Sequence, residues 1–120
     1  MEGIEIIESV LIEENSLLDT VIDKIWVCRN PKGNVEIKLT FSNFRINSRF
    51  ERIQLIFDDV VRFYFCHGEE HIFYIVSNYK FMQLADGVFY LSLDPDNSTE
   101  QLSDDDLDYI YSKKLKLITL

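Results

Sequence analysis

The sequence predicts a single all-β domain of seven to eight antiparallel strands, arranged as a sandwich or as a strongly curved sheet. Its apolar residues recur mainly with a period of two, which is the spacing of a half-buried strand. Clusters of turn-forming residues separate these segments at intervals of roughly 8–12 residues. With 120 residues, of which 47% are hydrophobic, the chain can bury one core, so we predict one domain over residues 1–120.

The N-terminal segment is ambiguous. Four of its apolar residues fit a helical spacing and two do not: Ile4, Ile7, Val10 and Leu11 in the first group, Ile6 and Ile12 in the second. A short helix would make the domain α+β, whereas a strand over residues 9–13 would keep it all-β. Short apolar runs do not separate these alternatives by period alone.

The next elements predict a hairpin. Residues 35–41 alternate apolar and polar side chains, and residues 21–27 form another strand-like segment before them. Between the two lies Asn30-Pro31-Lys32-Gly33-Asn34, a composition typical of turns. Residues 53–57 and 61–65 alternate in the same way, and we expect Asp58-Asp59 to separate them into two strands.

The second half of the chain predicts three more strands. Residues 71–79 are rich in β-branched and aromatic residues, and residues 88–93 follow a hairpin signal at Asp86-Gly87. Residues 109–120 contain no Gly or Pro and suggest a closing strand. If residues 115–120 form an open edge, that edge could pair two copies or be blocked by its lysines, and we expect a monomer or a weak homodimer.

Charge is distributed unevenly along the chain. Seven of the 21 acidic residues lie in residues 2–23 and seven in residues 94–108, and neither stretch contains Lys or Arg. The net charge of −9 disfavours nucleic acid and anionic membranes and favours a basic protein partner. The second stretch supplies the predicted partner-binding residues: Asp94, Asp96, Glu100, Asp104, Asp105, Asp106 and Asp108.

Cysteine usage and the N-terminus predict a cytoplasmic location. The first residues include Glu2, Glu5 and Glu8 and lack the basic and apolar regions of a signal peptide. Cys28 and Cys66 are therefore expected to be thiols. No apolar run approaches the roughly 20 residues that span a bilayer.

The sequence predicts no enzyme, no metal and no cofactor. Residues 94–105 fit a calcium loop poorly, because Thr99 stands where that loop needs Gly; a solvated turn capped by Ser103 fits better. Cys66, His67 and His71 lack the fourth ligand of a structural zinc site. The chain has neither a Gly-x-Ser-x-Gly turn nor a phosphate-binding glycine loop.

Two smaller features concern binding. Three arginines between residues 45 and 52 are interleaved with aromatic residues, a pattern found in nucleic-acid-binding surfaces. Because the chain has 21 acidic residues, which repel nucleic acid, surface ion pairs explain these arginines better. Four tyrosines could anchor a protein from the outer face of the sheet or pack across strands: Tyr64, Tyr74, Tyr79 and Tyr90.

Several segments resemble small β-rich bacterial immunity proteins that accompany polymorphic toxins. They are residues 18–22, 35–39, 55–60, 89–95 and 103–106, and the most distinctive is Leu91-Ser92-Leu93-Asp94-Pro95 with the Ser-Asp-rich stretch after it. The resemblance implies a protein that occludes a toxin or holds it inactive, often with an acidic surface against a basic nuclease, and without shared catalytic residues. The alternative is a β-sandwich that binds a small ligand or acts as a scaffold.

Overall fold

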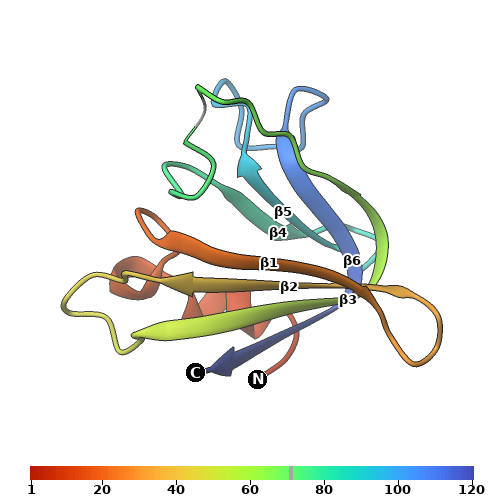
Figure 1. Cartoon of the computed structure of the whole chain (residues 1–120), viewed down its shortest axis with the longest axis horizontal. Helices are drawn as coiled ribbons and strands as arrows, with labels where there is room; N and C mark the ends of the chain where they lie inside the picture. Colours follow the sequence, from red (N-terminus) through yellow and green to blue (C-terminus); the bar gives the residue numbers. More distant parts are fainter. Residues whose placement is uncertain (71) are drawn as a thin grey trace.

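The computed structural model describes residues 1–70 and 72–120, and within them it shows one antiparallel sheet of six strands (Figure 1). The strands are β1 (Val21–Arg29), β2 (Val35–Ser42), β3 (Arg52–Tyr64), β4 (Lys80–Gln83), β5 (Phe89–Asp94) and β6 (Leu107–Thr119). Their order in the sheet is β1-β2-β3-β6-β5-β4. The all-β prediction is confirmed, but the structure has six strands instead of seven or eight, and the two separate sheets of a sandwich are not confirmed.

Both predicted hairpins are confirmed. The β1–β2 hairpin closes at the pair Arg29↔Val35, and the turn between them places Gly33 at φ 88°, a conformation that suits glycine. The β4–β5 hairpin turns at Asp86-Gly87, where the Gly87 N–H donates to the Leu84 carbonyl at 2.9 Å. Turn residues between alternating segments therefore located both hairpins correctly.

The predicted break at Asp58-Asp59 is wrong, because β3 runs through both residues. Asp59 has φ 51°, and the register between β3 and β6 shifts between Val60 and Arg62, so the strand bends without ending. The β1–β2 turn holds this bend: Asn30 Nδ2 donates to Asp58 at 2.8 Å, and Asn34 Nδ2 donates to Asp59 at 2.8 Å. The hydrogen bond from Asn34, and a further one from Asn30 Nδ2 to Asp59 at 3.2 Å, lower the pKa of Asp59.

The bend folds the single sheet into two layers. Figure 1 shows β3 and β6 turning together at the right-hand side, so that each long strand contributes to both layers. The lower layer contains β1, β2, the first half of β3 and the second half of β6. The upper layer contains β4, β5, the second half of β3 and the first half of β6.

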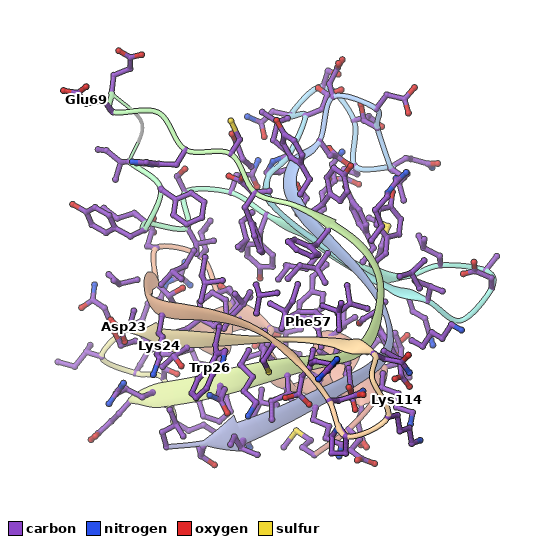
Figure 2. The ribbon with its side chains drawn as sticks, turned by 45° about the vertical axis from the view of Figure 1, so that its right-hand side comes forward. Asp23, Lys24, Trp26, Phe57, Glu69 and Lys114 are labelled. Carbon is purple, nitrogen blue, oxygen red and sulfur yellow. The ribbon has the colours of Figure 1, made fainter. Side chains whose placement is uncertain are left out.

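The core lies between these layers. Phe57 is fully buried and points into the space between them (Figure 2), where its ring centroid is 6.2 Å from that of Phe81. Leu39 and Leu55 from the lower layer and Ile110 from the upper layer are also fully buried. The N-terminal segment forms a single π-helical turn, η1 (Ile6–Val10), and a 3-10 turn, η2 (Glu13–Asn15). Of the two alternatives left open by the sequence, the short helix is therefore present, as one π-helical turn, and the strand over residues 9–13 is not.

The chain ends are placed differently from the prediction. β6 is an inner strand, between β3 and β5. β5 pairs only with the first half of β6, and on the same side the second half is hydrogen-bonded to the N-terminus, where the Gly3 N–H donates to the Leu115 carbonyl at 3.0 Å. The Met1 carbonyl accepts the Leu117 N–H at 2.9 Å as well, so the N-terminus covers residues 115–117, and the open edge considered for residues 115–120 is absent there. The predicted strand over residues 71–79 is wrong for residues 72–79, where only Ile75 bridges to Val21 before β4 begins. His71 lies outside the described residues.

Candidate functional site: an acidic and aromatic face

The acidic loop, residues 95–106, folds back over the outer face of the upper layer and is organised by Asp106. This carboxylate accepts hydrogen bonds from Lys80 Nζ at 2.8 Å, from the Tyr90 hydroxyl at 2.7 Å and from the backbone N–H groups of Asp96 and Ser103 at 2.8 and 3.1 Å. The Asp106 side chain has 0% exposure and the Lys80 side chain 7%, so the ion pair is buried. Asp106 thus bonds the loop to β4 and β5, and Lys80 Nζ adds a second link by donating to the Gln101 carbonyl at 2.6 Å.

The surroundings of Asp106 determine which groups are charged. Burial raises the pKa of Asp106, but the hydrogen bonds from Lys80 and Tyr90 and from the two N–H groups outweigh burial and hold that pKa below its ordinary value. Burial, and then the hydrogen bond to Asp106, raises the pKa of the Tyr90 hydroxyl. The Ser98 N–H, the Ser98 hydroxyl and the Ser103 hydroxyl lower the pKa of Asp96 to about 2. Asp96 and Asp106 are therefore ionised at neutral pH.

The structure separates the seven predicted partner-binding residues into inner and outer groups. Asp106 and Asp108 are buried, and Asp108 accepts the Cys66 N–H at 2.7 Å. We therefore correct the prediction for these two residues, because their carboxylates face partners within the chain and are not available on the surface. Asp94 and Asp96 are half-buried. Glu100, Asp104 and Asp105 are exposed.

A cluster of four tyrosines lies on the outer face of the upper layer, beside the acidic loop. Tyr90 pairs with Tyr111, and Tyr64 pairs with Tyr109, so all four side chains share one face. Ring centroids are 4.8 Å apart for Tyr90–Tyr111, 5.5 Å for Tyr109–Tyr111 and 5.8 Å for Tyr64–Tyr109. The Arg62 guanidinium lies 4.8 Å from the Tyr111 ring centroid and 5.3 Å from that of Tyr109.

Tyr90 connects the cluster to the loop, because its ring contacts Tyr111 and its hydroxyl binds Asp106. Tyr90 is 1% exposed, whereas Tyr64 is 43% exposed. Of the tyrosines proposed from sequence, Tyr64 and Tyr90 belong to this face and Tyr74 and Tyr79 do not. Sequence reasoning missed Tyr109 and Tyr111, although their alternation with the buried Ile110 was a signal that both share the outer face.

Other chemistry has less structural support. A cleft of about 430 Å³ next to the acidic loop is lined mainly by polar and charged groups, among them Asn78, Asp96, Asn97 and Glu100. Within residues 1–70 and 72–120, the structure places no group of three His, Cys, Asp or Glu residues that could hold a metal. The Ser103 hydroxyl accepts the Asp105 N–H at 3.1 Å, consistent with the expected turn at this position. Cys28 and Cys66 are free thiols.

Comparison with protein-family models, with curated proteins and with solved structures finds no match for this chain. In the described part of the chain, no helix has the length and hydrophobicity needed to cross a membrane. The acidic loop and the cluster of four tyrosines together form one surface, the acidic and aromatic face.

Proposed function

We propose that this protein is a non-enzymatic binding module, a cytoplasmic bacterial immunity or inhibitor protein that neutralises a basic toxin through the acidic and aromatic face. The observation that carries the proposal is the continuity of this face. The exposed carboxylates of Glu100, Asp104 and Asp105 belong to a loop that is bonded, through Asp106 and Tyr90, to the tyrosine cluster. Carboxylates attract a basic surface, and tyrosines are frequent anchors in protein interfaces.

The structure also supports a loop that is already ordered before binding. The four hydrogen bonds to Asp106 fix residues 96 and 103 relative to Lys80 and Tyr90. A preformed loop loses less conformational entropy on association than a disordered one. We therefore expect fast association that slows as salt screens the exposed carboxylates.

The alternative function, small-ligand binding, is favoured by two clefts of about 430 Å³ each, one beside the acidic loop and one between the N-terminus and β6. Ligand pockets are usually lined by apolar and aromatic side chains. The cleft beside the loop is lined largely by polar side chains, and the other is lined mainly by charged ones, among them Glu2, Asp58 and Lys114. Protein binding is thus the better supported proposal.

The test is a pull-down of the tagged protein from lysate of its source cells at low and high salt, with mass spectrometry of the bound proteins. We expect one basic protein that is retained at low salt and weakened at high salt. The double substitution Asp104→Asn/Asp105→Asn should reduce its recovery. The matched control, Glu5→Gln/Glu8→Gln, removes the same charge from exposed residues around η1, which lies in the lower part of Figure 1 whereas the acidic loop lies at the top. Equal recovery with both double variants would show that the wrong surface was assigned.

A further inference from the structure

The second half of β3 is an unpaired strand edge. β2 pairs with β3 only from Ser42↔Arg52 to Ile37↔Phe57, so in the described part of the chain residues 58–64 have β6 on one side and no strand on the other. An edge strand turns alternate backbone N–H and C=O groups outward, where another strand can bond to them.

Exposed apolar side chains accompany this edge. Val61 is 58% exposed, Phe63 is 40% exposed and Tyr64 is 43% exposed. The Phe63 ring lies 5.7 Å from the ring of Phe65, which follows the strand and is partly buried against the core. Arg62, the only charged side chain between Val60 and Phe65, leans over Tyr109 and Tyr111 toward β6 and so away from the edge.

The other two edges of the sheet are protected. β1 has a register irregularity between Ile22 and Lys24, and Lys24 and Trp26 stand together on it (Figure 2), with Lys24 Nζ 4.7 Å from the Trp26 ring centroid. Lysines and irregularities are the usual devices that prevent edge pairing. β4 has only four residues, and short edges are a further such device. β3 also has an irregularity, at Val60/Arg62, but unlike β1 it carries no lysine in residues 58–64, and its last two residues, Phe63 and Tyr64, pair regularly with β6.

We propose that the second half of β3 accepts an extended, basic segment of a partner protein as an added strand. The backbone would supply hydrogen bonds, Val61 and Phe63 would contact apolar side chains of the segment, and the net charge of −9 would favour lysine or arginine at its remaining positions. The same net charge on a second copy opposes pairing of two identical edges, which is why the occupant is a basic partner. This inference deepens the proposed function and rests on it, because Tyr64 belongs both to the β3 edge and to the tyrosine cluster.

The probe is a capped peptide of about eight alternating Lys and Val residues, the length of a typical strand, added to the ¹⁵N-labelled full-length protein. We expect shifts of the backbone amide resonances of residues 60–65. The same peptide with N-methyl groups on alternate residues, which blocks strand pairing, should produce no such shifts, and a Glu-Val peptide should bind more weakly. Val61→Lys should weaken binding by about tenfold or more, since it removes an apolar contact and adds a repelling charge. The control Ile118→Lys, at a residue of similar exposure on β6, should leave binding unchanged.

Three results would overturn the inference: equal binding of the N-methylated peptide, shifts confined to the acidic loop, or concentration-dependent dimerisation in sedimentation that Val61→Lys abolishes. Failure of the peptide with recovery of a salt-sensitive basic partner in the pull-down would refute strand addition and leave the proposed function intact. Peptide binding at β3 without any basic partner in the pull-down would support strand addition and refute the proposed function.

Discussion

Removal of the Asp106 carboxylate charge provides the most demanding test of how the acidic face is built. In Asp106→Asn the charged Lys80 ammonium stays where it is, with a side chain that is only 7% exposed, and loses a counter-ion at 2.8 Å. Breaking a buried ion pair by changing one partner costs about 3–5 kcal/mol. Against a typical total stability of about 5–15 kcal/mol, this loss is large.

The same loss can be expressed as a melting temperature. An unfolding entropy of about 2.1 cal/mol/K per residue gives about 250 cal/mol/K for 120 residues. A loss of about 3–5 kcal/mol therefore lowers the melting temperature by about 12–20 °C. Urea denaturation followed by circular dichroism measures the free energy, and a thermal scan measures the shift. The double variant Asp106→Asn/Lys80→Met should be more stable than the sum of the two single losses predicts, by about 2–3 kcal/mol. A loss below about 1 kcal/mol for Asp106→Asn would refute the argument that this pair is buried and organises the loop.

Three further predictions follow from the geometry. The pKa of Asp96 is lowered to about 2 in the folded protein, so the contribution of Asp96 to stability is complete above the ordinary carboxyl pKa of 3.8 and is lost as pH falls from about 4 to 2. The free energy of unfolding, measured at a series of pH values, should therefore depend less steeply on pH in this range for Asp96→Asn than for the wild-type protein. Because the pKa of Tyr90 is raised, its contribution is present below pH 10 and lost above it, so Tyr90→Phe should flatten the alkaline limb of the same measurement, and an unchanged limb would contradict the hydrogen bond. Phe57→Ala should cost about 3–5 kcal/mol in urea denaturation, because the fully buried ring fills the space between the layers, and a loss near zero would show that the layers do not pack around it.

The bend in β3 gives a prediction about backbone conformation. Asp59 has φ 51°, which glycine adopts without strain and alanine does not. Asp59→Ala and Asp59→Gly both remove the hydrogen bond from Asn34 and the ion pair with Lys114, so the difference between them reports the backbone alone. We expect the glycine variant to melt at the higher temperature. The reverse order would contradict the left-handed conformation at the bend.

Local signals in the sequence located elements that depend on local chemistry. Alternation and turn residues placed the β1–β2 and β4–β5 hairpins, since a hairpin is specified by a few adjacent residues. The pair Asp58-Asp59 was interpreted as a break for the same reason, because adjacent aspartates are common in turns. What keeps β3 continuous is remote in sequence: Asn30 and Asn34 bind these carboxylates from another hairpin. No local pattern contains that contact.

In the acidic and aromatic face, too, local sequence signals were informative and remote contacts were not predictable. Composition indicated an acidic surface between residues 94 and 108, and Glu100, Asp104 and Asp105 are indeed exposed. Burial of Asp106 could not be predicted from a run of aspartates, because its cause is Lys80, 26 residues away. A weak signal was present, since Lys80 stands between Tyr79 and Phe81 in a short strand, where an unpaired lysine would be costly to bury.

The association rate of the partner recovered by pull-down, measured over a series of salt concentrations, tests the central claim most directly. We predict that the rate for the wild-type protein and for Glu5→Gln/Glu8→Gln falls steeply as salt rises, and that Asp104→Asn/Asp105→Asn is slower at low salt with a shallower dependence. Identical rates and identical salt dependence for all three proteins would contradict the assignment of the acidic and aromatic face as the binding surface.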